Sequence, residues 1–105
     1  MGKRIAPPEV PPVTVAGVKI EVLHWGRERG LAQNGGYVVA VDPVTGKELW
    51  TLRIYDVIYD GAMEEDVQDV FIASLRAVGD RHVEIVDENG RRYLLDVTTR
   101  SVTSP

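Results

Sequence analysis

Residues 38–52 read VVAVDPVTGKELWTL, two apolar runs separated by turn-forming residues. Asp42 can accept a hydrogen bond from a backbone N–H two residues later, and Pro43 sets φ for the first position of a turn. Gly46 supplies the positive φ that closes a type I turn followed by a bulge. These residues predict a β-hairpin at the centre of a small all-β domain.

Alternation of apolar and polar residues continues on both sides of this hairpin. Val18, Ile20 and Val22 alternate with charged residues, which predicts a strand with one buried face. Residues 37–41 are apolar on both faces, as in a central strand that is covered on each side. Further sets alternate in the same way: Trp50, Leu52 and Ile54; Val83 and Ile85; Leu95 and Val97. We therefore expect an all-β fold, a compact antiparallel meander that forms a small barrel or sandwich.

A second hairpin is predicted in the C-terminal third of the chain. Residues 83–97 read VEIVDENGRRYLLDV, with Asn89-Gly90 between two apolar runs. Asn-Gly is a strong hairpin signal because both residues tolerate positive φ. We expect the turn to lie at these two residues.

Residues 63–78 fit two structures. Apolar residues at helical spacing, with acidic residues early and Gly79 at the end, favour a capped helix and an α+β fold. The alternative is a long strand over 67–78, with Asp69 in solvent and one face made of Phe71, Ala73 and Leu75. We favour the strand because the short turn 79–81 leads into a strand that needs an antiparallel neighbour.

The chain has 105 residues and no cysteine, enough for one domain that folds without a disulfide. Residues 1–12 contain four prolines and predict an extended arm, followed by a single β domain over 13–105. These prolines interrupt any apolar run that could serve as a signal peptide. The expected location is therefore the cytoplasm.

Composition and motifs argue against several function classes. The net charge of −4 does not favour a nucleic-acid partner, and we expect neither a membrane partner nor a cofactor. His24 and His82 lack the spacing of a metal motif and a nearby serine, so we expect no enzyme. His24 should be partly buried and hydrogen-bonded, and His82 exposed at the start of a strand.

An acidic stretch follows the first hairpin, and residues 54–75 contain no Lys or Arg. The carboxylate oxygens of this stretch could bind Ca²⁺ or Mg²⁺. However, an EF-hand register with Gly61 at its sixth position places Ile58 and Val67, which have no side-chain oxygen, at ligand positions. We expect a solvated acidic loop, with divalent binding or a basic partner as alternatives. Its carboxylates are Asp56, Asp60, Glu64, Glu65, Asp66 and Asp69.

Residues 25–36 form a glycine-rich connection that could contact a ligand or partner. Arginines offer planar donors to a carboxylate or phosphate, amides add uncharged hydrogen bonds, and aromatic rings can anchor a partner. The sequence thus predicts a non-enzymatic binding or protein-interaction module whose partner is another protein or a small anionic ligand. The candidate residues are Trp25, Arg27, Arg29, Gln33, Asn34, Tyr55 and Tyr59.

Both hairpins resemble the outer hairpin of a blade in quinoprotein-type (PQQ-like) β-propellers. Residues 38–52 carry an apolar run, Asp42, a Gly-Lys turn and Glu48-Leu49-Trp50, and residues 83–97 repeat this outline. A propeller needs about four or more four-stranded blades, so this chain cannot close one alone. The resemblance implies an alternative function: a related fragment that binds a small molecule or completes a propeller by oligomerising. It transfers no cofactor-binding residue to this chain.

Overall fold

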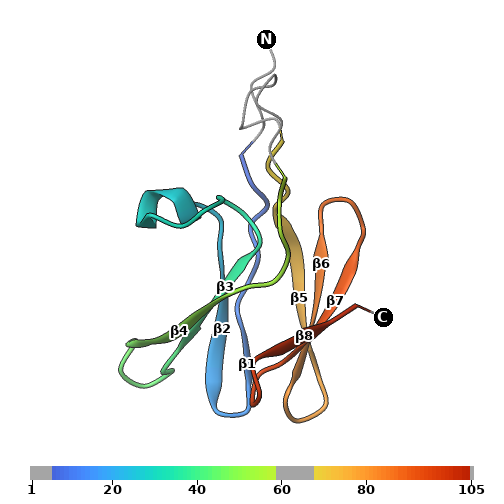
Figure 1. The fold of residues 1–105 in the computed structure, drawn as a ribbon. Helices are drawn as coiled ribbons and strands as arrows, with labels where there is room; N and C mark the ends of the chain where they lie inside the picture. Colours follow the sequence, from blue (N-terminus) through green and yellow to red (C-terminus); the bar gives the residue numbers. More distant parts are fainter. Residues whose placement is uncertain (1–5, 59–67, 105) are drawn as a thin grey trace.

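The structure, a computed structural model, describes residues 6–58 and 68–104. Two four-stranded antiparallel sheets follow each other along the chain, and each is a meander in sequence order (Figure 1). The first contains β1 (Val13–Val15), β2 (Val18–Leu23), β3 (Tyr37–Val41) and β4 (Glu48–Arg53). The second contains β5 (Ile72–Val78), β6 (His82–Asp87), β7 (Arg92–Asp96) and β8 (Ser101–Thr103). The expected all-β class is confirmed as a sandwich-like pair of open sheets, not a closed barrel.

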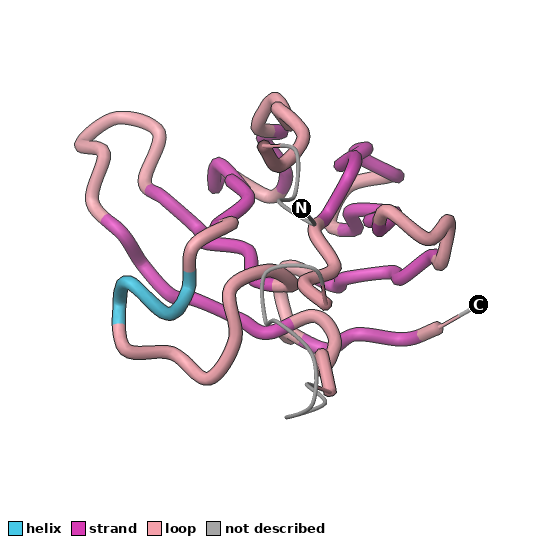
Figure 2. Tube along the Cα trace, turned by 90° about the horizontal axis from the view of Figure 1, so that it is seen from above, coloured by secondary structure: helices cyan, strands magenta, loops and turns pink. Residues whose placement is uncertain are grey.

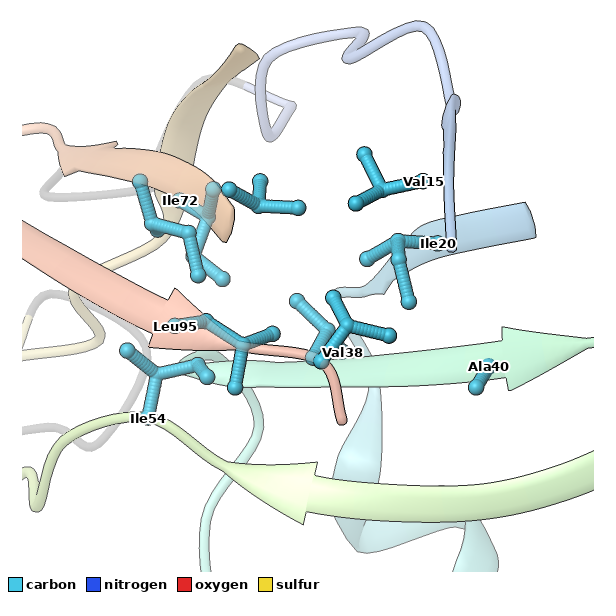
Figure 3. Close-up of a cluster of buried hydrophobic side chains, with 10 residues drawn as sticks. Val15, Ile20, Val38, Ala40, Ile54, Ile72 and Leu95 are labelled. Atoms are coloured by element: carbon cyan, nitrogen blue, oxygen red, sulfur yellow. The ribbon is translucent and has the colours of Figure 1, made fainter. Parts of the chain in front are cut away.

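The apolar inner faces of the two sheets meet in one core (Figure 3). Ile20 and Val38 of the first sheet and Ile85 of the second are fully buried. Burial of each such side chain contributes about 1.5–3 kcal/mol, so the core is what joins the sheets. Its buried members are Val15, Ile20, Val38, Ala40, Ile54, Ile72, Val83, Ile85, Leu95 and Val97.

Strand β3 is buried on both faces, as expected for the run 37–41. Val38 and Ala40 belong to the core. On the opposite face, the Tyr37 ring packs against the 3-10 helix η1 (Gly26–Arg29), close enough to leave no room for a Cβ on Gly26. Helix η1 lies on the outer side of the first sheet, away from the second sheet (Figure 2). The connection between β2 and β3 therefore covers the outer end of β3.

Three hairpin turns share one device, an aspartate that accepts backbone hydrogen bonds. Asp42 Oδ1 accepts from the N–H of the residue two positions later at 2.8 Å, as expected. Asp87 and Asp96 do the same at 2.8 Å and 2.9 Å. Gly46 has the predicted positive φ of 76°. A side-chain acceptor thus fixes each of these turns where the strand ends.

The turn between β6 and β7 differs in detail from the expected Asn89-Gly90 turn. Gly90 has φ 83°, but Asn89 does not adopt a positive φ. The N–H of Gly90 donates to the Asp87 carbonyl at 3.0 Å, and the N–H of Asp87 donates to the Arg91 carbonyl at 3.0 Å. These bonds define a three-residue loop of the type I plus bulge class, in which a single residue needs positive φ. The predicted second hairpin is confirmed, with the positive φ at Gly90 alone.

The ambiguous segment is a strand where it can be described. Strand β5 covers residues 72–78, so the helix alternative is wrong there, while residues 63–67 lie outside the described residues. A bulge between Ile72 and Ser74 shifts the alternation by one residue. Ile72 and Leu75 consequently pack on the core, and the expected shared face of Phe71, Ala73 and Leu75 is wrong.

Residues 6–12 form no strand or helix, but Pro8 is tied to the sheet. Its carbonyl accepts a hydrogen bond from His24 Nε2 at 2.7 Å, which confirms the expected partly buried and hydrogen-bonded His24. The other ring nitrogen, Nδ1, is buried and has no partner among the described residues. His82 opens β6 as expected, but its side chain is partly buried 3.7 Å from Asp96 and not exposed.

Substitution of Gly90 by valine should lower the free energy of unfolding by about 1–2 kcal/mol, because a β-branched residue resists positive φ. A Cβ at this position meets no atom within 4 Å, so the cost is conformational. The control Gly90→Asn should lose less, since Asn tolerates this region. Chemical denaturation measures both, and equal losses would contradict the assigned turn.

Asp96 should make the fold sensitive to acid. Hydrogen bonds from the Thr99 N–H, and then from Thr98, lower the pKa of Asp96, assisted by the charges of Arg81 and His82 and opposed by burial. A lowered folded-state pKa stabilises the fold above the unfolded pKa of about 4, and this stabilisation is lost as pH falls through the folded value.

The variant Asp96→Asn keeps an acceptor for the turn but removes the charge. Its deficit in melting temperature relative to the wild type should be largest near neutral pH and should shrink below about pH 4. Asp80→Asn, exposed in the turn between β5 and β6, is the control and should show no such trend. A deficit of Asp96→Asn that is constant with pH would contradict the expectation.

Candidate functional site

The connection between β2 and β3 is built around the side chain of Gln33, which is 3% exposed. Its Nε2 donates to the carbonyl of Gly35 at 2.9 Å and to that of Tyr55 at 2.7 Å. Its Oε1 accepts from the N–H of Val57 at 2.9 Å. The amide that we expected to contact a ligand therefore joins the connection to the segment after β4.

The glycines of this connection permit close contact between chain segments. A Cβ on Gly35 would lie 2.5 Å from the Val70 carbonyl oxygen and 2.9 Å from Phe71 Cδ1. A Cβ on Gly26 would lie 2.6 Å from the Tyr37 ring. The space beside these glycines is therefore filled by the protein's own backbone and rings and not by a ligand or partner.

Asn34 also acts within the protein. Its Nδ2 donates to Asp69 Oδ2 at 3.1 Å, and its Oδ1 accepts from the N–H of Arg27 at 3.3 Å. Asp69 is 3% exposed, so the expectation of a solvated Asp69 is wrong. The carboxylate can be buried because an amide donor from a distant part of the chain reaches it.

Arg29 of η1 forms a two-pronged ion pair with Glu48 at the start of β4. The two terminal guanidinium nitrogens each donate to one carboxylate oxygen at 2.9 Å. This hydrogen bonding raises the pKa of Arg29 and lowers the pKa of Glu48. Both side chains are close to half exposed, so the ion pair contributes little to the free energy of unfolding. Its main effect is to orient η1 relative to β4. Glu48 carries no local signal that predicts this role, because its partner Arg29 lies 19 positions away in the chain.

Tyr55 is fixed at both ends of its side chain. Its hydroxyl donates to the Val70 carbonyl at 2.6 Å, and its ring stacks on Tyr93 at 5.0 Å between centroids. Tyr93 in turn donates to Asp87 Oδ2 at 2.9 Å. Burial, reinforced by Asp87, raises the pKa of Tyr93 to about 12. Tyr55 therefore connects the two sheets. Tyr59, the other tyrosine among the candidates, lies outside the described residues.

Trp25 is the candidate residue with a large exposed apolar side chain, at 42% exposure. Its ring stands edge-on to Phe71, with 5.5 Å between centroids. Arg27 and Arg29 follow it in η1 and are also exposed. We call Trp25, Arg27 and Arg29 the η1 surface. Of the candidate residues that can be described, these three remain at the exterior, while Gln33, Asn34 and Tyr55 hold the connection from within.

Metal binding and membrane crossing by a helix are two further possibilities for the described residues. No group of three or more His, Cys, Asp or Glu side chains in the described ranges could hold a metal ion. Asp56 pairs with Arg53 at 2.9 Å, and Asp60, Glu64, Glu65 and Asp66 lie outside these ranges. No described helix is long and apolar enough to cross a membrane.

Comparison of the chain with protein-family models, with curated proteins and with solved structures finds no match.

Replacing Gln33 by leucine should lower the free energy of unfolding by about 2 kcal/mol, because the Val57 N–H and the carbonyls of Gly35 and Tyr55 lose the partner that the buried Gln33 amide provides. The control Glu28→Leu, also a polar residue changed to leucine but exposed on η1, should change it by less than about 0.5 kcal/mol. Urea denaturation of both variants measures the difference. Similar stabilities would show that Gln33 does not hold the connection.

Proposed function

We propose that this protein is a non-enzymatic interaction module that binds another protein through the η1 surface. The observation that carries the proposal is an exposed tryptophan on a connection whose polar groups are bonded within the protein. Such a connection need not be ordered on binding, which lowers the entropic cost of association.

The residue types of the η1 surface suit a protein interface. Tryptophan and arginine are enriched among residues that dominate binding energy. Trp25 is supported from behind by Phe71, so its exposed part is presented in a defined orientation. Other exposed apolar side chains, such as Val44 at 91%, lack an adjacent pair of arginines.

A protein partner is favoured over a small anion. Both terminal nitrogens of Arg29 are bonded to Glu48, and the Nε of Arg27 donates to the Ala32 carbonyl at 3.4 Å. A small anion would have to displace Glu48 to reach Arg29, with little apolar contact in return. A protein can instead bury the Trp25 ring and leave the ion pair at the rim of the interface.

Affinity capture with immobilised variants tests the proposal. Trp25→Ala should weaken binding of the captured protein by about 10-fold or more, as expected for an interface anchor. The control Val44→Ala removes a more exposed apolar side chain on the turn between β3 and β4 and should bind like the wild type. Equal binding by Trp25→Ala and the wild type, with melting temperatures unchanged, would overturn the proposal.

The alternative is a fragment related to quinoprotein propellers that completes a ring by oligomerising. One observation favours this alternative. The two meanders follow each other along the chain, and their first strands, β1 and β5, pack side by side. The first strands of neighbouring propeller blades would be placed in the same way. Against it, the outer face of the second sheet carries Arg76 and Arg92, both more than 60% exposed and paired with Glu84. A further blade would bury these charges. Native mass spectrometry separates the two, since a monomer argues against the ring.

A further inference from the structure

The chain has two asparagines, Asn34 and Asn89, and glycine follows each of them. In such a pair the glycine backbone nitrogen can attack the asparagine side-chain carbon Cγ. A new N–Cγ bond forms, the Cγ–Nδ2 bond breaks, and the side-chain nitrogen leaves as ammonia with the proton of the glycine N–H. Water then opens the resulting succinimide at either carbonyl and gives aspartate or isoaspartate. The attacking glycine nitrogen is the same at both sites, so we expect the surrounding fold to set the difference in rate between them.

At Asn34 the fold opposes this reaction. Both atoms of the side-chain amide are bonded, Nδ2 to Asp69 and Oδ1 to the Arg27 N–H, and the Asn34 carbonyl accepts from the Gly26 N–H at 2.9 Å. Gly35 is buried against the Val70 carbonyl and the Phe71 ring. Ring closure requires rotation of the side chain and the adjoining backbone, and here that would break the packed connection between β2 and β3.

At Asn89 the surroundings are open. The residue is exposed at the tip of the hairpin between β6 and β7, and its side-chain amide has no hydrogen-bond partner among the described residues. No atom lies within 4 Å of a Cβ built on Gly90, so the neighbouring backbone has room to turn. One turn bond, from the Gly90 N–H to the Asp87 carbonyl at 3.0 Å, must open before the nitrogen can attack. Local opening at an exposed hairpin tip costs far less than opening of a buried segment.

We propose that Asn89 is a site of spontaneous deamidation in this protein and that Asn34 is protected from it by the fold. The aspartate product adds a negative charge beside Asp87 and Glu88. The isoaspartate product lengthens the main chain within the turn, where Asp87 Oδ1 accepts from the Asn89 N–H at 2.8 Å and from the Arg91 N–H at 3.0 Å. The modification therefore acts on the device that closes this hairpin.

The test incubates the full chain in mildly alkaline buffer well below its melting temperature and follows deamidation by mass spectrometry of tryptic peptides. Cleavage after Arg and Lys places the two asparagines in separate peptides, 30–47 and 82–91. The ratio of deamidated to intact peptide then gives each rate in the same sample. A parallel incubation in concentrated urea supplies the rates without the fold.

In buffer we expect Asn89 to convert at least about 10-fold faster than Asn34, as a difference in opening free energy of about 1.4 kcal/mol would produce. In urea the two rates should become similar. Conversion of Asn34 as fast as Asn89 in buffer would overturn the proposal. Persistence of the full rate difference in urea would also overturn it, because the local sequence and not the fold would then be responsible.

Discussion

Each meander of this protein has one apolar face that must be buried, and the mutual burial of those two faces is the constraint on which the structure depends. Neither sheet has a second layer of helices among the described residues, so each serves as the cover of the other. An isolated open sheet with an apolar face would be unstable in water. The segments that connect and flank the sheets therefore have to hold them in one relative position.

Polar groups perform that task at one end of the sandwich. Gln33 joins the connection between β2 and β3 to the segment after β4, and Asn34 joins it to Asp69 ahead of β5. Tyr55 adds a bond to the Val70 carbonyl and a stacking contact with Tyr93 of the second sheet. Buried polar groups that are fully bonded specify one arrangement, which apolar packing alone does less strictly.

The sequence predicted the elements whose causes are local. Alternation over β2, the two-sided apolar run of β3 and the Asp42 turn all depend on residues near each other in the chain, and all are present. The errors arise where a cause is irregular or distant. A single extra residue in the bulge of β5 reverses the face of every residue before it, and period-two reasoning cannot detect it.

Prediction of the candidate site from the sequence fails for the same reason, because the deciding contacts are distant in the chain. The amide side chains of Gln33 and Asn34 are suited to bind a ligand, but the fold uses their hydrogen bonds internally, with partners up to 35 positions away. A polar residue in a glycine-rich connection is equally suited to hold the connection or to bind a ligand. Its partners decide, and they are not visible in a local pattern. Trp25 is different, because its ring contacts Phe71 but the residue still remains exposed to solvent.

The turns at Asp42 and Asp87 are similar in sequence, but the contacts of the two carboxylates extend to different distances in the structure. Both carboxylates accept two backbone hydrogen bonds within their turn. The second oxygen of Asp87 also accepts from the Tyr93 hydroxyl, and Tyr93 stacks on the ring of Tyr55, whose carbonyl accepts from Gln33. The β6–β7 turn is therefore in continuous contact with the support of the η1 surface, whereas the Asp42 carboxylate bonds only within its own turn among the described residues. The proposed deamidation of Asn89 would act at one end of this network. It is therefore physically connected to the proposed binding surface through Asp87, Tyr93 and Tyr55.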